Sequence, residues 1–169
     1  MNQKLVIIRG APASGKTTLC ERLRDFDKKI VWLSIDKIKP VFSEYKDETL
    51  DEVNETALVI LSSLLDRNYS VVMDGIFKKP EHVQKAIEIG RTRNIPVVVY
   101  QLEISLEALQ ARDKIRAGVK EGCRKPLGDE VIESLFNKVE NNPIAGAIKL
   151  NTENQTLDEC LEMVRKNFE

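Results

Sequence analysis

The chain has 169 residues, 42% of them hydrophobic, which suits one ordinary domain with a buried core and is too little for two. Its 26 basic and 27 acidic residues give a net charge of -1, which excludes a global attraction to nucleic acid or to an acidic membrane. Three scattered cysteines and a single histidine argue against a disulfide framework and against a Cys/His zinc site. The apolar runs are strand-sized and no signal-peptide pattern opens the chain, so we expect no membrane span and a cytoplasmic protein.

The predicted elements alternate between strands and helices. Short apolar runs predict strands, and apolar residues that recur every three or four positions predict helices. In chain order they are strand 4–9, helix 16–26, strand 30–35, a helix across 50–65, strand 71–73, helix 80–92, strand 95–102, a helix from Ser105, helix 129–139, a weak strand 144–150 and helix 156–168.

This alternation predicts the fold class. Parallel strands need crossover connections, which the helices supply, so we expect an α/β three-layer sandwich with a five-stranded, mainly parallel sheet. Residues 1–169 form one domain in this interpretation. Ligands of such sheets bind beyond the carboxyl ends of the strands. The residues at those ends are Gly10, Asp36, Asp74 and Glu103.

A glycine-rich loop follows the first predicted strand. Its residues match G-x-x-x-x-G-K-[ST] in the strand, loop and helix context that the motif requires, and they are Gly10, Ala11, Pro12, Ala13, Ser14, Gly15, Lys16 and Thr17. The glycines let backbone N–H groups point at phosphate oxygens, and the helix N-terminus adds partial positive charge. We expect Lys16 to bridge the β- and γ-phosphates, Thr17 to ligate Mg²⁺ and Thr18 to reach the α-phosphate. The predicted ligands are therefore ATP and Mg²⁺.

Two aspartates complete the predicted chemistry. Asp74 ends an apolar strand in the manner of a Walker B carboxylate, so we expect it to act on the magnesium ion. Asp36 directly follows the second strand, where an acceptor hydroxyl would approach the γ-phosphate. A carboxylate there can act as general base, although it can also simply cap a short helix.

The P-loop, Asp36 within Ser-x-Asp-x-Ile-Lys, the strand-end Asp74 and a later Arg-x-x-x-Arg together resemble one family. This is the P-loop kinases that include phage-type polynucleotide 5′-kinases, zeta toxins and chloramphenicol phosphotransferases. The resemblance spans most of the chain. It implies that Asp36 is the general base and that Lys39, three positions on, contacts the acceptor. The polynucleotide kinases typically have arginine at that position.

A basic segment after the fourth strand is similar to the lid of that family. Arg112 and Arg116 are one turn apart, and we expect both to lie on one helix face and to grip the triphosphate. The lid would occupy about residues 105–128. The alternative for this segment is a solvated helix face.

The phosphate acceptor stays open at this level. A polynucleotide 5′-hydroxyl at a single-stranded end and a small-molecule alcohol are both compatible with the sequence. Other candidate functions are a non-catalytic ATP-binding switch or adaptor and a nucleoside monophosphate kinase. Two further residues are expected to be structural, with Trp32 in the core and His82 on the surface.

Overall fold

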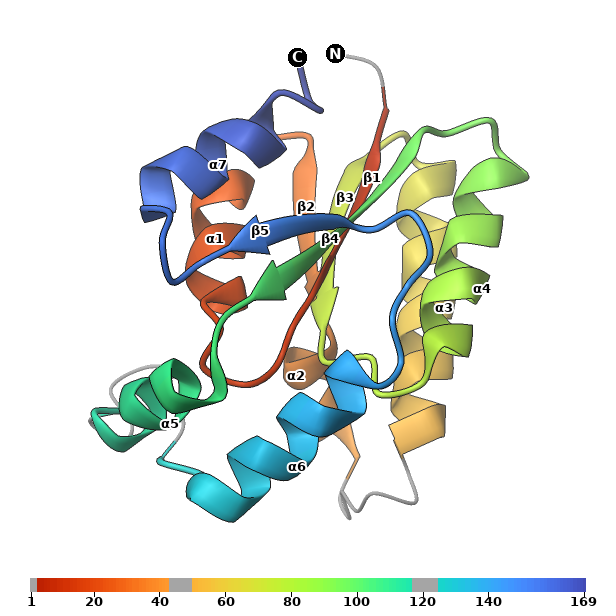
Figure 1. Cartoon of the computed structure of the whole chain (residues 1–169). Helices are drawn as coiled ribbons and strands as arrows, with labels where there is room; N and C mark the ends of the chain where they lie inside the picture. Colours follow the sequence, from red (N-terminus) through yellow and green to blue (C-terminus); the bar gives the residue numbers. More distant parts are fainter. Residues whose placement is uncertain (1–2, 43–49, 117–124) are drawn as a thin grey trace.

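The protein is built around one parallel sheet with the strand order β2-β3-β1-β4-β5 (Figure 1). The computed structural model describes residues 3–42, 50–116 and 125–169. All neighbouring strands in the sheet run parallel, so the predicted five-stranded α/β sheet is confirmed. The chain moves from β1 to one side of it and later crosses to the other, which places a topological switch point at the end of β1.

The strands and helices occur in the predicted order along the chain. The strands are β1 (Leu5–Arg9), β2 (Ile30–Ser34), β3 (Ser70–Gly75), β4 (Val97–Glu103) and β5 (Ile148–Asn151). The helices are α1 (Lys16–Arg24), α2 (Ile35–Ile38), the 3-10 turn η1 (Lys39–Val41), α3 (Leu50–Asp66), α4 (Pro80–Arg91), α5 (Leu106–Lys114), α6 (Asp129–Glu140) and α7 (Leu157–Arg165).

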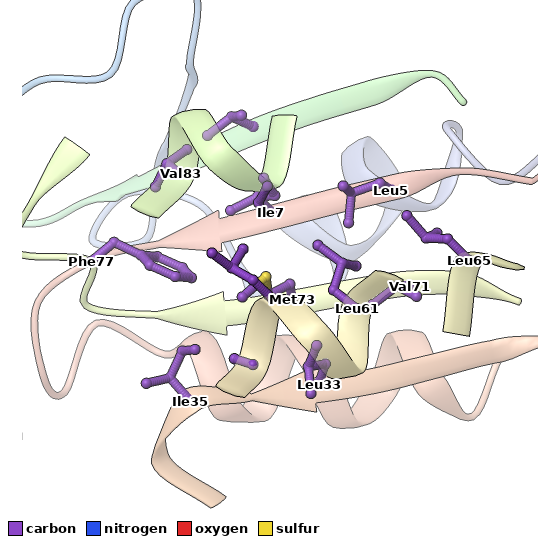
Figure 2. Close-up of a cluster of buried hydrophobic side chains, with 14 of the residues drawn as sticks. Leu5, Ile7, Leu33, Ile35, Leu61, Leu65, Val71, Met73, Phe77 and Val83 are labelled. Carbon is purple, nitrogen blue, oxygen red and sulfur yellow. The ribbon is translucent and has the colours of Figure 1, made fainter. Parts of the chain in front are cut away.

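Strand β1 lies at the centre of two apolar layers, because side chains alternate between the faces of a strand. Leu5 and Ile7 pack with α3 and α4 in the larger cluster, where Leu61, Met73 and Val83 also lie (Figure 2). Val6 and Ile8 pack on the opposite face against apolar residues of α1 and α7. The central strand is thus fully buried, and the loop that follows it starts from a rigid support.

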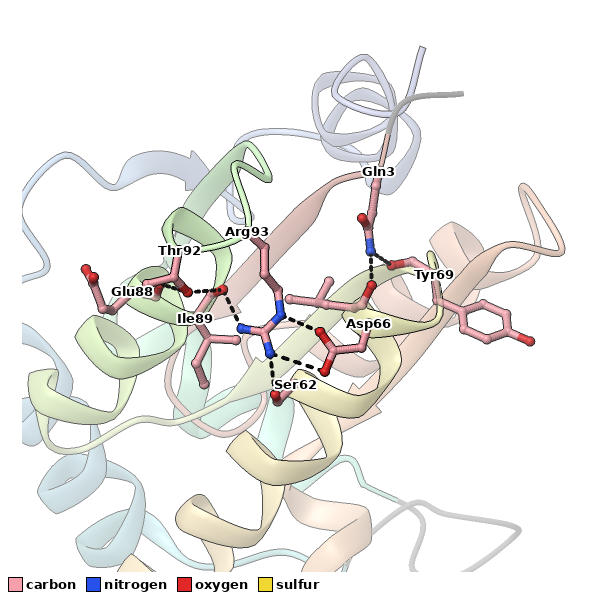
Figure 3. A network of polar contacts seen from close by, with 9 residues as sticks. Gln3, Ser62, Asp66, Tyr69, Glu88, Ile89, Thr92 and Arg93 are labelled. Atoms are coloured by element: carbon pink, nitrogen blue, oxygen red, sulfur yellow. Dashed lines mark hydrogen bonds and ion pairs between the residues drawn. The ribbon is translucent and has the colours of Figure 1, made fainter.

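A polar network ties α3 to α4 beside the larger cluster. The Arg93 guanidinium donates to Asp66 and to the Ser62 hydroxyl at 2.7 and 2.6 Å, and to the carbonyl of Ile89 at 3.0 Å (Figure 3). The network lies toward the amino ends of the strands, since Gln3, just before β1, bonds the carbonyls of Leu65 and Tyr69. The network therefore stabilises the packing of α3 against α4, and it lies away from the carboxyl ends of the strands, where the site is expected.

Two differences from the predicted elements concern where strands begin and end. The weak strand predicted over 144–150 is shorter, since only Ile148–Asn151 pairs with β4, while Ile144 is buried in the larger cluster outside any strand. Ile35, which was expected in the second strand, lies in α2. Asp36 also lies inside α2, so it is not the N-cap of that helix, and Ser34 occupies the N-cap position. The predicted lid segment includes residues 117–124, which lie outside the described residues.

Helices α2, α5 and α6 lie at the end of the sheet where β1 finishes (Figure 1). Of the helices that the structure describes, none combines the length and the apolar character needed to cross a membrane.

Candidate active site

The glycine-rich loop has the backbone geometry of a phosphate cradle. Gly15 has φ of +98° and Ala13 has φ of +67°, so the loop curls through left-handed conformations before α1 begins. A Cβ on Gly10 would lie 2.7 Å from Ser14 Oγ and 3.1 Å from the Cβ of Leu102, so only glycine fits there. Within the described part of the chain, the buried Ser14 Oγ has no hydrogen-bond partner. A tight cradle with an unpaired hydroxyl fits a phosphate group.

The first turn of α1 faces this loop with basic and hydroxyl side chains and carries no acidic residue. Thr17 and Thr18 are exposed, so their hydroxyls are accessible to a ligand. Lys16 is buried, and its Nζ donates to the carbonyls of Gly10 and Ala11, each at 2.8 Å. The amine is thus held over the loop by bonds that an incoming phosphate could replace.

Charged groups from separate elements act on Lys16. Burial lowers the pKa of the Lys16 amine, while the negative charges of Asp74 and Asp36 oppose that effect and the charge of Arg116 adds to it. Electrostatic influence of this kind requires proximity. The sheet register agrees with this for the two aspartates, because Ile8 of β1 and Ser34, directly before α2, are both paired with Asp74.

Asp74 lies inside β3 and is buried, with 2% of its surface exposed. Burial raises the pKa of its carboxyl, and this is opposed by a hydrogen bond from Trp32, by the charge of Lys16 and by a hydrogen bond with Ser34. The indole Nε1 of Trp32 donates to Asp74 Oδ1 at 2.7 Å. With the Thr17 hydroxyl, this carboxylate offers the hard oxygen ligands that Mg²⁺ takes alongside nucleotide phosphates, so the residues present fit the ion.

Asp36 and Lys39 form one pair at the acceptor side. The Nζ of Lys39 lies 2.5 Å from Asp36 Oδ1, and the Lys39 side chain is only 10% exposed. Asp36 itself is half-buried in the first turn of α2. Lys39 is therefore placed against the predicted general base, and its predicted contact with the acceptor stays a prediction.

The prediction that Arg112 and Arg116 share one helix face is wrong. Helix α5 ends at Lys114, and Arg116 lies beyond the C-cap Ile115. Asp113, in the last turn of the helix, binds the backbone of residues that precede α6. Arg112 instead donates to the carbonyl of Thr152 at 2.6 Å, so it contacts the segment after β5. The charge of Arg116, by contrast, lowers the pKa of Lys16.

Asp113 is a site residue that the sequence did not reveal. It is 1% exposed, its Oδ2 accepts the backbone N–H groups of Leu127 and Gly128 at 2.7 and 3.0 Å, and its Oδ1 lies 3.4 Å from Arg116 Nη1. The carboxylate thus joins the end of α5 to the start of α6 and orients Arg116. In the sequence it is one acid within a basic run, and only the return of the chain at Leu127 shows its role.

Arg9, the last residue of β1, is a second residue of the site whose role the sequence did not reveal. It is fully buried directly before the P-loop and donates to the carbonyl of Phe77 at 3.2 Å and to Gln101 Oε1 at 2.9 Å. Gln101 in turn lies 3.4 Å from a carboxylate oxygen of Glu140 at the end of α6. Burial lowers the pKa of Arg9 and the charge of Glu140 opposes this. The base of the cradle is therefore fixed to β4, α6 and the loop after β3.

A family model described as an AAA domain, AAA_33, matches residues 5–141. The chain belongs to this family. No curated protein sequence matches the chain. The predicted resemblance to P-loop kinases is confirmed by this AAA domain together with solved structures that share its fold.

Three solved structures illustrate that fold. A sugar kinase from Janibacter sp. HTCC2649 has a TM-score of 0.71 at 16% identity, over 97% of this chain and 93% of that chain. The tunicamycin resistance protein of Deinococcus radiodurans has a TM-score of 0.69 at 10% identity, over 99% and 96%. A chain of the Pnkp1/Rnl/Hen1 RNA repair complex has a TM-score of 0.67 at 19% identity, over 83% of this chain and 45% of that chain. At these identities the likeness is one of fold.

Proposed function

We propose that this AAA domain is a cytoplasmic, ATP-dependent kinase that transfers the γ-phosphate of ATP to a hydroxyl acceptor, with Mg²⁺ as cofactor. One observation carries the proposal. The glycine-rich loop with its buried Lys16 amine, the Asp74 carboxylate and the pair of Asp36 with Lys39 all lie at one end of the sheet, because Asp74 is paired with Ile8 of β1 and with Ser34 directly before α2. A switch or adaptor needs the phosphate cradle but no carboxylate such as Asp36 at the acceptor side.

Each side chain has a distinct role in this mechanism. Asp36 accepts the proton of the acceptor hydroxyl while the oxygen of that hydroxyl forms a bond to the γ-phosphorus. The bond between the γ-phosphorus and the β–γ bridging oxygen breaks, and ADP leaves. Lys16 and Arg116 neutralise charge on the phosphates during the transfer, and Lys39 orients Asp36 through their pair. Thr17 and Asp74 would hold the magnesium ion, which would supply Lewis-acid neutralisation of the phosphate charge. Arg112, bound to the carbonyl of Thr152, shapes the segment beside the nucleotide.

We place a small-molecule alcohol first among the acceptors. Two lysines of the acceptor edge are paired with carboxylates, Lys39 with Asp36 and Lys79 with Asp51, so these two add little net positive charge. Single-stranded nucleic acid normally needs a basic groove. In addition, the similarity to the sugar kinase covers nearly the whole of both chains, which favours an acceptor of this small size.

A polynucleotide 5′-hydroxyl is the second candidate, since the fold also occurs in a chain of an RNA repair complex. A nucleoside monophosphate kinase would instead take a phosphate oxygen as acceptor.

The test is transfer of label from γ-labelled ATP with Mg²⁺. Small alcohols, nucleoside monophosphates and 5′-hydroxyl oligonucleotides are offered separately, and the labelled fraction is identified. We expect label on a small alcohol, a loss of about 100-fold or more in rate for Lys16→Ala and Asp36→Asn, and unchanged ATP binding for Asp36→Asn. Lys28→Ala, at an exposed lysine, is the matched control. ATP binding without transfer to any acceptor contradicts the kinase and favours a switch.

A further inference from the structure

Trp32 is the single tryptophan of the chain, and it lies against the carboxylate that we assign to magnesium. Strands β2 and β3 are parallel, with Trp32 opposite Val72 and Ser34 opposite Asp74. Residues two apart on a strand point to the same face, so the indole and the carboxylate share one face of the sheet. The indole extends along that face to Asp74 and donates its N–H at 2.7 Å.

This bond restricts the carboxylate. An indole has one donor and no acceptor, so its N–H can only fix an acceptor in place. The Asp74 side chain is buried, and a charge-assisted bond of this length fixes its rotation. A purely apolar residue at position 32 would fill the same space without fixing the carboxylate.

The ring itself is held by cations from two elements. The Nζ of Lys37, on α2, lies 3.6 Å from the ring centroid, and the guanidinium carbon of Arg24, at the end of α1, lies 5.9 Å from it. Trp32 is only partly buried, on the edge strand β2, so these contacts stabilise a ring that the core alone does not enclose. The indole is therefore a fixed donor.

We propose that Trp32 is a positioning residue that orients the Asp74 carboxylate for the magnesium ion of the nucleotide complex, and that its fluorescence reports this ion. The inference rests on the proposed function, since it needs ATP and Mg²⁺ at the P-loop. It goes further by giving a role to a residue that the proposed mechanism leaves without one. Outer partners of metal-binding carboxylates commonly change metal affinity by about 10- to 100-fold.

The first experiment follows Trp32 emission during titrations of the full chain. We expect ATP with Mg²⁺ to change the emission and ATP with EDTA to change it much less. The reason is that only the metal ion would withdraw electron density from the Asp74 carboxylate that accepts the indole N–H. Asp74→Asn keeps an acceptor for the indole and should lose the metal response. An identical response with Mg²⁺ and with EDTA overturns the reporter role.

The second experiment uses Trp32→Phe, which keeps an aromatic ring and removes the N–H. Retention of labelled ATP is measured by equilibrium dialysis over a series of Mg²⁺ concentrations. We expect the Mg²⁺ midpoint to rise about tenfold or more, with ATP affinity in EDTA unchanged. Val31→Ala is the control that disturbs the same strand on the opposite face of the sheet but keeps the N–H bond, and it should leave the midpoint near that of the wild type.

The outcomes separate the two levels of inference. If wild-type protein retains no ATP at the P-loop, the proposed function fails and the role of Trp32 falls with it. If wild-type protein shows a Mg²⁺ midpoint that Trp32→Phe shares, the positioning role alone fails. Equal losses of affinity with Mg²⁺ and in EDTA, or an equal shift in Val31→Ala, also overturn it, because they indicate general disturbance of the strand.

Discussion

His82 lies in the first turn of α4 with only 7% of its side chain exposed, although a surface position was expected. Its Nε2 is 3.4 Å from Asp51 Oδ1, and Lys79 binds the other oxygen of the same carboxylate at 2.6 Å. Burial lowers the pKa of His82, and the negative charge of Asp51 opposes this. The charged groups that act on this imidazole are Asp51, Lys79, Glu55 and Lys85.

This environment predicts a loss of stability on acidification. The unfolded histidine takes up a proton as the pH falls below its ordinary pKa of about 6.5, whereas the folded one does so only at lower pH. The free energy of unfolding should therefore decrease through that interval and level off below the folded pKa. Urea unfolding over a pH series measures it, and His82→Gln should show a smaller decrease. Coincident pH profiles for the two proteins would refute the assignment.

At the scale of elements, Asp113 is the link between α5 and α6. Removing its carboxylate in Asp113→Ala leaves two backbone donors without their acceptor, which should cost about 2 kcal/mol or more in stability. It also releases Arg116 from its ion pair. We expect slower phosphate transfer and a lower unfolding midpoint in this variant.

Asp113→Asn separates these two effects. The amide oxygen can still accept from the backbone N–H groups of Leu127 and Gly128, but it carries no charge for Arg116. Stability should be largely restored while kcat stays low and ATP affinity in EDTA is unaffected. Normal kcat in Asp113→Asn would show that the residue only holds the two helices together. Glu133→Gln, at an exposed position of α6, is the control.

At the scale of the whole molecule, the site is attached to several elements that are far apart in the sequence. The cradle continues from the central β1, while Arg9 connects its base to β4 and, through Gln101, to α6. A ligand that bridges the cradle, Asp74 and Arg116 therefore binds only the folded chain. Its binding must raise the unfolding temperature by mass action.

We expect ATP with Mg²⁺ at 100 times its dissociation constant to stabilise the fold by about 2.7 kcal/mol. For a chain of this size that corresponds to a rise of roughly 5 to 10 °C in Tm. Differential scanning calorimetry with and without the nucleotide measures it. Lys16→Ala should lose the shift, while Lys28→Ala should keep it. A shift that persists in Lys16→Ala would locate nucleotide binding elsewhere.

Much of the architecture could be predicted because its signals are local. The P-loop is a contiguous motif whose backbone geometry depends on Gly10 and Gly15, and the apolar runs of β1 and β4 reflect burial on both faces of a parallel sheet. Ser105 and Thr156 are N-caps whose partners lie three residues away. Interactions over such short separations do not depend on how the rest of the chain folds.

The sequence by itself therefore determined the order of strands and helices, the α/β class and the position of the phosphate cradle. Only the tertiary structure decided which charged side chains meet there. Arg116 pairs with Asp113, whose carboxylate also binds the backbone before α6, while Arg112 binds the carbonyl of Thr152. Trp32 reaches Asp74 across 42 positions of sequence through the pairing of β2 with β3. Such contacts depend on strand register and on the return of distant segments, and periodicity along one stretch of chain carries no information about either.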